Sequence, residues 1–282
     1  MNLGIYLNKK CLVTGAASGI GRSVALLLGK YGAELFLTDI DEAKLQQTEN
    51  DIINQNGKVS YSKAFDIRDY DAVKIFSDEI QNSFGAMDMV MNIAGVAIWG
   101  EVGKMPHEDW KKIIDVNLMG PIHIIECFIP AMMKNGYGGN LVNVSSAAGL
   151  FGLPWHGAYS ASKFGLRGLS DVLRHDLKRN KIRVHLVCPG AVDTGLVDTI
   201  KISGMEITDD QFSVLKKRFQ GRAVSPDEAA ASILKGVENK EYLIFTSTDI
   251  KFGHWGQRKF TFIYDWIMQK MNVLFQKALT GQ

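Results

Sequence analysis

A tyrosine and a lysine four residues apart stand in the stretch YSASKFG, Tyr159 to Gly165. On a helix this spacing places both side chains on one face, close enough for the ammonium group to influence the phenol. Such a pair can transfer a proton, but the same spacing also occurs in ordinary solvated helices. Polar and glycine-rich motifs elsewhere in the chain must therefore decide between the two interpretations.

A glycine-rich turn, TGAASGIG, follows the first apolar run, with glycines at 15, 19 and 21. Glycines between a strand and a helix let the backbone approach a pyrophosphate, and the helix N-terminus adds N–H groups and a positive dipole end. The spacing is G-x-x-x-G-x-G rather than the usual dinucleotide fingerprint. A tight turn without a ligand is the alternative interpretation of this motif.

Asp39 ends the second apolar run, eighteen residues after Gly21. A carboxylate there can accept hydrogen bonds from the hydroxyls of an adenosine ribose, and it would repel a 2′-phosphate. Ser18 brings no compensating charge, and Arg22 lies one position too far into the helix for an obvious phosphate contact. These residues favour NAD over NADP. Asp39 could instead cap the following helix, although Asp41 is equally suited to that role.

Three further motifs end predicted strands: NIAG, which begins at Asn92, NVSS, which ends at Ser146, and PGAVDT, which begins at Pro189. Asn117 lies inside an otherwise apolar helical segment, where its helix propensity is poor. Because ligands of parallel sheets bind beyond the carboxyl ends of the strands, these motifs are expected to meet there.

The elements that must position these residues alternate regularly along the chain. Strands are predicted at KKCLVTG, ELFLTDI, KVSYSKAFD, MDMVMNIAG, GNLVNVSS, KIRVHLVCPG and EYLIFTS, with helices between them that include long ones at about 106–134 and 159–179. Apolar runs without alternation are typical of strands buried on both faces. The pattern predicts an α/β fold, a single-domain, doubly wound parallel sheet with helices on both faces and a C-terminal helical extension.

Charge and cysteine content bear on nucleic-acid binding, metal binding and cellular compartment. The 282 residues carry a net charge of +2, which gives no indication of nucleic-acid binding. Three separated cysteines, Cys11, Cys127 and Cys188, have no metal-ligand spacing, so we expect buried thiols, no metal site and a reducing cytoplasmic environment. The N-terminus has no apolar stretch of signal-peptide length, and no uninterrupted apolar run approaches the roughly 20 residues of a membrane span.

Together the motifs TGAASGIG, NIAG, DVN, NVSS, YSASK and PGAVDT resemble, in order and spacing, the short-chain dehydrogenase/reductase family over about residues 8–247. The resemblance implies a Rossmann-like fold and hydride transfer between a nicotinamide cofactor and an alcohol or carbonyl. It assigns a catalytic tetrad of Asn117, Ser146, Tyr159 and Lys163. Ser146 matches better than Ser145, because it lies thirteen residues before the tyrosine.

Within that resemblance, Tyr159 is the general acid/base, and a nearby ammonium together with the positive nicotinamide ring is expected to lower its pKa from about 10. Ser146 is expected to bind the substrate oxygen, Lys163 the nicotinamide ribose, and Asn117 a water. The cofactor contacts implied by the resemblance are Gly15, Ser18, Ile20, Gly21, Asp39, Asp66, Ile67, Asn92, Ala94, Gly95, Tyr159, Lys163, Pro189, Gly190, Val192 and Thr194. Ile93 departs from the family pattern, which usually has a second asparagine there.

The segments expected to contact substrate are VAIWG, AAGLFGLPWHGA and the region after PGAVDT. Their large apolar side chains, represented by Trp99, Phe151, Trp155 and Leu196, predict a pocket for an apolar secondary alcohol or ketone. These residues could also serve only to pack the loops. His156, three residues before Tyr159, could touch the substrate or be an ordinary loop residue.

Residues 249–282 form an amphipathic extension to the catalytic unit of residues 1–248. Phe262, Trp266, Met268, Met271, Leu274 and Phe275 are spaced roughly as one helix face. The extension is interpreted as a lid over the pocket, a subunit contact or a surface helix on a membrane, and packing on the protein itself is favoured over the membrane.

The prediction for function is therefore an NAD-dependent oxidoreductase acting on CH–OH groups of a small molecule, with a homodimer or homotetramer expected from family habit. An NADPH-dependent carbonyl reductase and a non-catalytic, redox-sensing dinucleotide-binding protein are the alternatives. We expect a cytoplasmic protein, with peripheral membrane association through the extension as the less favoured variant.

Overall fold

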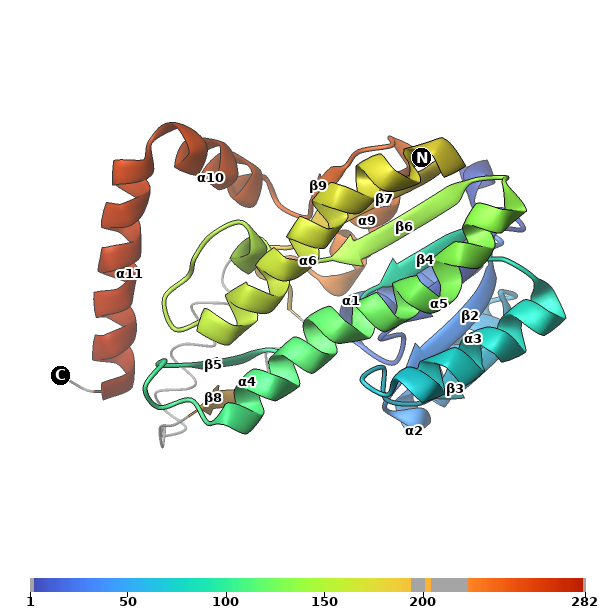
Figure 1. Ribbon diagram of the computed structural model, residues 1–282, viewed down its shortest axis with the longest axis horizontal. Helices are drawn as coiled ribbons and strands as arrows, with labels where there is room; N and C mark the ends of the chain where they lie inside the picture. Colours follow the sequence, from blue (N-terminus) through green and yellow to red (C-terminus); the bar gives the residue numbers. More distant parts are fainter. Residues whose placement is uncertain (1–2, 194–200, 204–222, 281–282) are drawn as a thin grey trace.

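The computed structural model describes residues 3–193, 201–203 and 223–280 (Figure 1). Thr194 and Leu196, two of the residues singled out above, lie outside these ranges.

Seven parallel strands form the central sheet, in the order β3-β2-β1-β4-β6-β7-β9. Their bounds are β1 Lys10–Thr14, β2 Glu34–Asp39, β3 Lys58–Ala64, β4 Met89–Asn92, β6 Gly139–Val144, β7 Ile182–Cys188 and β9 Leu243–Phe245. The strand order reverses between β1 and β4, which creates a crevice at the carboxyl ends of these two strands. The predicted fold class is confirmed, including all seven predicted strands.

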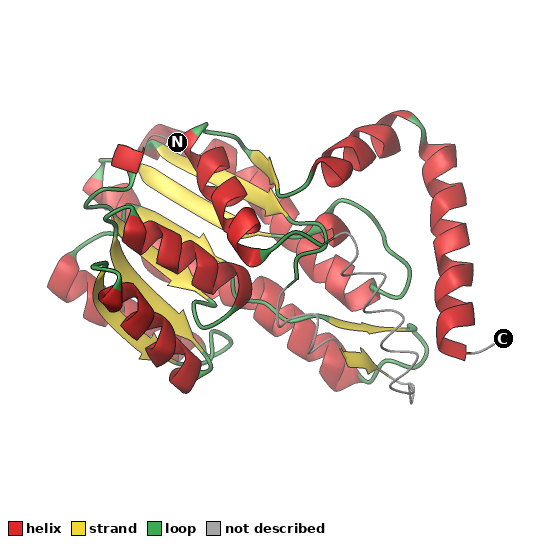
Figure 2. Cartoon of the chain, turned by 180° about the vertical axis from the view of Figure 1, so that it is seen from behind, coloured by secondary structure: helices red, strands yellow, loops and turns green. Residues whose placement is uncertain are grey.

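Helices cover both faces of the sheet, as Figure 2 shows. Their bounds are α1 Gly19–Lys30, α2 Glu42–Asn54, α3 Tyr70–Phe84, α4 His107–Ile114, α5 Gly120–Asn135, α6 Gly157–Asp176, α9 Pro226–Glu238, α10 Thr248–Lys259 and α11 Thr261–Thr280. One buried cluster joins the sheet to α1, α2 and α9, and a second joins the other face to α3 and α5. Because both faces are covered, β1 and β7 are buried along almost their whole length.

Local sequence explains several helix boundaries. Asp41 and Asp69 each accept a hydrogen bond from a backbone N–H of the first turn, Lys44 for α2 and Ala72 for α3. Ser225 opens α9 with a reciprocal capping box. These caps set where the helices begin, and so fix the loops that precede them at the sheet edge.

Three elements were not anticipated. Helix α9 had no predicted counterpart, and the short strands β5, Ile98–Gly100, and β8, Lys201–Ser203, pair in a separate two-stranded sheet. The predicted long helix is present, but a π turn over Asp115–Met119 separates α4 from α5. Three-residue strands and a one-residue change of helical register leave little periodicity in the sequence.

The stretch His107–Asn135 is, among the described residues, the single helical segment long and apolar enough to cross a bilayer. A search of the sequence for uninterrupted apolar runs does not find this segment, because polar residues interrupt it. Ile124, Phe128 and Met132 bury one side of it in the core beside the sheet. Its apolar character is therefore explained by packing within the fold.

Candidate active site

The glycine turn lies in the crevice between β1 and β4, and its glycines are required there. Gly15 has a φ of +71°, and a Cβ on it would lie 2.8 Å from the Cα of Ala94. A Cβ on Gly21 would lie 2.0 Å from the carbonyl oxygen of Gly15. The glycines therefore let β1, α1 and the segment after β4 pack closely, and they place the backbone of the turn where a pyrophosphate would bind.

Helix α1 begins at this turn. Ser18, its N-cap residue, is exposed, and its side chain makes no capping hydrogen bond. Ile20 is partly buried and packs against the core. The first turn of α1 therefore presents backbone N–H groups and a positive dipole end toward the crevice without a side-chain cap.

Thr14 ties the two strand ends together and was not identified from the sequence. Its Oγ1 accepts hydrogen bonds from the backbone N–H groups of Ile93, at 3.0 Å, and Ala94, at 3.1 Å. Its position one residue before the first glycine was the available signal. Ile93, the departure from the family pattern, keeps this backbone contact and packs its side chain against the core.

Asp39 stands at the carboxyl end of β2 beside the glycine turn. Its carboxylate accepts hydrogen bonds from the backbone N–H groups of Ala17, at 3.0 Å, and Asp41, at 3.1 Å. The capping role belongs to Asp41, which accepts from Lys44 N–H. Arg22 forms an ion pair with Asp51 at 2.6 Å on the neighbouring helix. Asp39 is thus half-buried at the crevice, and Arg22 is held by another carboxylate.

At the next strand end, Asp66 and Ile67 have different surroundings. Arg68 donates two side-chain hydrogen bonds to Asp66, at 2.6 and 2.8 Å, and they hold the pKa of that carboxyl below its usual range. Ile67 is buried against Gly120, and its carbonyl oxygen lies 3.0 Å from Nδ1 of His123.

The Asn92 side chain does not reach the crevice. It donates to Asn143 at 2.9 Å, and Asn143 donates to Ser170 at 2.9 Å, all three buried between β4, β6 and α6. This chain of hydrogen bonds holds the centre of the sheet. Any contact between Asn92 and a cofactor would therefore fall to its backbone.

Lys163 is buried on the first half of α6. Its Nζ donates to the carbonyl oxygen of Val144 at 3.0 Å, at the end of β6. Burial lowers its pKa to about 8. A Cβ on Gly95 would lie 3.5 Å from this nitrogen, so the glycine keeps the space between the β4 end and the lysine open.

Tyr159 is half-buried one helical turn earlier, with its ring centroid 5.8 Å from Lys163 Nζ. Burial raises the pKa of the phenol, and a hydrogen bond with Ser146 lowers it by less. Desolvation thus outweighs the Ser146 hydrogen bond in the chain alone, and the lowering expected with a bound nicotinamide stays a prediction.

The two adjacent serines have different partners. Ser145 is buried, and its hydroxyl donates to the carbonyl oxygen of Lys163 at 2.9 Å. Ser146 accepts from Ala148 N–H at 3.1 Å and is hydrogen-bonded to Tyr159. Ser146 is thus the serine beside the phenol, as the spacing to Tyr159 predicts.

Asn117 lies in the π turn, fully buried. Its amide nitrogen donates to the carbonyl oxygen of Val96 at 2.9 Å and to Ser162 at 3.3 Å, while its oxygen accepts from Val96 N–H at 2.8 Å. These bonds clamp the segment after β4 onto α6. Both side-chain N–H donors of Asn117 are thus engaged within the fold.

His156 packs beside Tyr159, their ring centroids 6.3 Å apart. Burial lowers its pKa from 6.5 to about 4, and its Nδ1 lies 2.6 Å from the carbonyl oxygen of Pro154. Trp99 covers its other side, with centroids 4.5 Å apart. His156 is therefore a neutral, buried neighbour of the phenol rather than an ordinary loop residue.

The loop between Ser146 and Tyr159 is held by the C-terminal extension. The Tyr264 hydroxyl accepts from Gly152 N–H at 2.8 Å, and Trp155 Nε1 donates to Asn272 at 3.2 Å. Phe151 is buried beneath the extension, with its ring 6.4 Å from those of His254 and Tyr264. Phe151 serves as packing here, whereas Trp155, with a φ of +66°, is half-buried at the loop tip.

The segment after β7 packs against the serine loop and the start of the C-terminal extension. The carbonyl oxygen of Pro189 accepts from Ala147 N–H at 2.7 Å, Gly190 packs against Ile250, and Val192 bridges to Val224. Pro189 thereby joins β7 to the serine loop.

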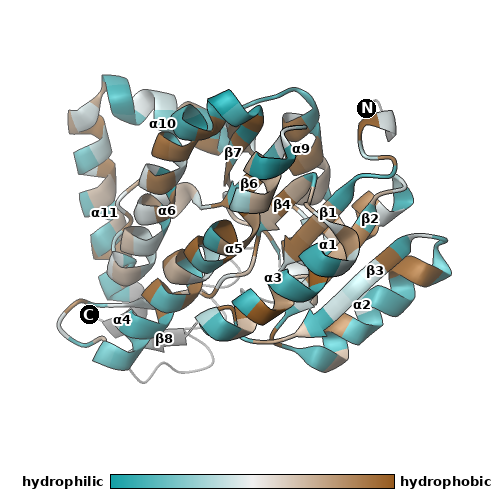
Figure 3. Cartoon of the chain, turned by 45° about the vertical axis from the view of Figure 1, so that its right-hand side comes forward, coloured by the Kyte–Doolittle hydropathy of each residue, from teal (hydrophilic) through white to brown (hydrophobic). Residues whose placement is uncertain are grey.

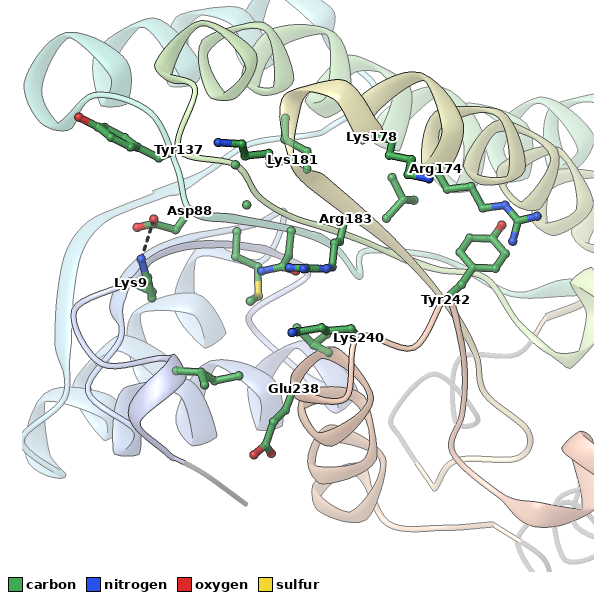
Figure 4. Close-up of a pocket in the computed structure, with 18 of the residues that line it drawn as sticks. Lys9, Asp88, Tyr137, Arg174, Lys178, Lys181, Arg183, Glu238, Lys240 and Tyr242 are labelled. Atoms are coloured by element: carbon green, nitrogen blue, oxygen red, sulfur yellow. Dashed lines mark hydrogen bonds and ion pairs between the residues drawn. The ribbon is translucent and has the colours of Figure 1, made fainter.

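A cavity lined by many basic side chains lies at the opposite end of the sheet (Figure 4). Lys178, Lys181, Arg183 and Lys240 line it, where β6 and β7 begin. It is remote from the tetrad. The described residues hold no cluster of histidine, cysteine or carboxylate side chains suited to a metal ion.

Comparisons with known proteins place this arrangement in a family. A family model for short chain dehydrogenases matches residues 9–203. "Probable oxidoreductase EphD" of Mycobacterium tuberculosis is 34% identical over 233 residues, which span 81% of this chain but 39% of that protein.

Two solved structures show the same fold. A short-chain dehydrogenase/reductase from Burkholderia phymatum, in complex with NAD, is 26% identical with a TM-score of 0.81, over 90% of this chain and 94% of that one. A metagenomic short-chain oxidoreductase in complex with NADP is 30% identical with a TM-score of 0.68, over 86% and 98%.

Proposed function

The chain belongs to the short-chain dehydrogenase/reductase family, and on that premise we propose that it transfers a hydride between NAD and an apolar secondary alcohol or the corresponding ketone. The proposal depends on one observation: Ser146, Tyr159 and Lys163 lie together at the carboxyl ends of the strands, where the glycine turn also lies. Family members bind NAD or NADP, and the choice of NAD is part of the proposal.

The crevice suits a dinucleotide. Gly15 and Gly21 let the turn pack closely, because a Cβ on either would collide with backbone, and the uncapped first turn of α1 offers N–H groups to a pyrophosphate. Asp39 would accept from the adenosine ribose hydroxyls, and its charge would disfavour a 2′-phosphate. When bound, the nicotinamide supplies the site that accepts or donates the hydride.

The proton moves at Tyr159. Its raised pKa makes the phenol neutral near pH 7, the form that donates a proton to a carbonyl oxygen. Alcohol oxidation needs the phenolate, which the Ser146 hydrogen bond and the cation of Lys163 favour. Ser146 already accepts from Ala148 N–H, so its own hydrogen can serve Tyr159 or the substrate oxygen.

Lys163 and Asn117 keep these groups in place. Lys163 is anchored to Val144, and we assign its remaining N–H donors to the nicotinamide ribose. Asn117 fixes the segment after β4 through both Val96 bonds, and its backbone would hold the water that exchanges the proton with solvent.

An apolar substrate is supported by the groups around Tyr159. Neutral His156 and the ring of Trp99 lie on one side, and the loops Val96–Gly100 and Ala147–Ala158 contain no lysine or arginine. A pocket with few charged groups selects apolar ligands. Cytoplasmic localisation and assembly as a dimer or tetramer stay predictions from the sequence.

The test is steady-state turnover with NAD and with NADP over secondary alcohols from small polyols to steroids and long-chain alcohols. Asp39→Asn should move the NADP-to-NAD ratio of kcat/KM by about tenfold toward NADP, since a charge beside the ribose is removed. Asp41→Asn, two residues away on the cap of α2, is the matched control and should leave the ratio unchanged. Turnover with NADP alone would refute the choice of NAD. A preference for small polyols would refute the apolar substrate class. No turnover with any alcohol would favour a non-catalytic binding protein.

A further inference from the structure

Helices α10 and α11 carry large apolar side chains that remain exposed among the described residues. Figures 1 and 3 place the pair at the edge of the molecule, on the far side from the N-terminus. On α11 the exposed large apolar residues are Phe262, Ile263, Trp266, Ile267, Val273 and Leu274. Phe252 and Trp255 on α10 are also exposed, at 71% and 59%. We call these eight residues the outer face.

This distribution corrects the single helix face expected from the sequence. Phe262 and Trp266 are 71% and 60% exposed, and Leu274 is exposed as well. Met268, Met271 and Phe275 are instead half-buried on the opposite side, where Phe275 packs against His156. Helix α11 is therefore apolar on two sides, and its inner side alone is used within the chain.

The outer face is also basic. At 100° per residue the six α11 residues fall within an arc of about 140°, and Lys270 and Lys277 fall inside the same arc. Lys251, Arg258 and Lys259 add three cations on α10, against two carboxylates, Asp249 and Asp265, in both helices. Among the described residues, none of these five cations forms an ion pair.

We propose that the outer face docks on an anionic lipid membrane, with α11 lying in the plane of the surface. Tryptophan and phenylalanine side chains beside lysine are the composition of helices that bind this interface, where lysine stems extend toward the headgroups. Each cation near an anionic leaflet adds to the attraction. The proposal goes beyond the proposed function and does not depend on it.

Charge argues against a second copy of this chain as the occupant. A symmetric contact through the outer face would bring two sets of five cations together, with two carboxylates in each set. Helix α11 also carries Asp265, Lys270 and Lys277 along its length, so it suits lying on a bilayer rather than crossing it.

The test is sedimentation of the full chain with vesicles of phosphatidylcholine and phosphatidylglycerol, compared with phosphatidylcholine alone. The wild type should bind the anionic vesicles, less at high salt, and the neutral ones weakly. Replacing Trp255, Phe262 and Trp266 by Gln should lower the vesicle partition coefficient by about tenfold or more, because their apolar area no longer enters the interface. These residues are exposed, so circular dichroism should show an unchanged fold.

Matched control variants distinguish binding through the outer face from nonspecific adsorption of the protein to vesicles. One control variant carries Ile75→Gln, Tyr137→Gln and Val172→Gln, which change exposed apolar residues elsewhere. Vesicle binding by this variant should be unchanged. A variant with Lys251→Gln, Lys259→Gln and Lys270→Gln should bind anionic vesicles more weakly. A variant with Lys178→Gln, Lys181→Gln and Lys240→Gln, in the cavity of Figure 4, should bind them as the wild type does.

Three outcomes overturn the proposal. One is a folded wild type that fails to bind anionic vesicles. Another is an equal loss of vesicle binding in the outer-face variants and in the control variants. The third is a dimer, seen by light scattering, that the aromatic variants dissociate while no form binds vesicles.

Discussion

The two sides of Tyr159 are built by different means. On the cofactor side, Thr14, Asn117 and Lys163 are fixed by hydrogen bonds to backbone atoms at strand ends. On the substrate side, His156 is held largely by ring contacts, and Trp155 by a backbone bond from Gly100 N–H and a side-chain bond to Asn272 of the C-terminal extension. The first side is therefore fixed mainly by bonds between the central elements of the fold. The second depends on segments more than a hundred residues apart, and it can change without disturbing the first.

The adjacent serines offer the largest expected contrast. Ser146→Ala should lower kcat by about 10²–10³-fold, because the hydrogen bond to the substrate oxygen is lost. Ser145→Ala should keep kcat within a few-fold and lower the free energy of unfolding by about 1 kcal/mol, since it removes a buried bond to the Lys163 carbonyl. Steady-state kinetics and urea unfolding measure both. Equal losses of kcat would show that Ser146 is not distinguished from its neighbour.

A pH series on Lys163 tests the cofactor side. A folded-state pKa of about 8, below the ordinary 10.5, means that the native state binds fewer protons than the unfolded chain between these values. Stability from this group is therefore present above pH 10.5 and is lost as pH falls to about 8. The free energy of unfolding of the wild type relative to Lys163→Met should rise from pH 8 to 10.5. Parallel curves would mean that burial does not shift this lysine.

The corresponding series on His156 tests the substrate side in acid. Its pKa is lowered from 6.5 to about 4, so stability from this group is present above pH 6.5 and is lost as pH falls to 4. The wild type should lose stability across that window relative to His156→Gln, measured by thermal unfolding. If both proteins lost stability equally, the histidine would have to be solvated rather than packed between Trp99 and Tyr159.

Sequence motifs indicate specific residues on the cofactor side, whereas the substrate side is indicated only by apolar composition. The glycine turn, Asp39 and the Tyr159–Lys163 pair follow local rules of spacing at strand ends, so they were found without a structure. Thr14 was missed because one hydroxyl before a glycine carries no periodic signal. The orientation of α11 was missed for a different reason: both of its sides are apolar, so the pattern could not indicate which side packs inward.

The effect of burial on the Tyr159 pKa could not be predicted from the sequence either. The motif indicates which charges lie near the phenol, but desolvation depends on how completely the surrounding residues exclude water. Likewise, the sequence names Asn92 by position but does not show where its side chain points, and the register of β4 with β6 directs it to Asn143.

The smallest expected effect concerns the extension. Tyr264→Phe removes the hydroxyl that bonds both the N–H and the carbonyl oxygen of Gly152. KM for the alcohol should rise a few-fold with kcat unchanged, since the substrate loop loosens while the tetrad stays intact. Initial rates over a range of alcohol concentrations measure this. A fall in kcat at constant KM would instead show that the extension supports the chemical step.

The most direct test of the account is turnover by Tyr159→Phe with saturating NAD and alcohol, together with NADH affinity measured by fluorescence. The variant should bind NADH as tightly as the wild type within a few-fold, because the crevice is unchanged, while kcat falls by about 10²–10⁴-fold for want of the proton-transfer group. Turnover close to that of the wild type, with the same NADH affinity, would contradict the role of Tyr159 and with it the proposed mechanism.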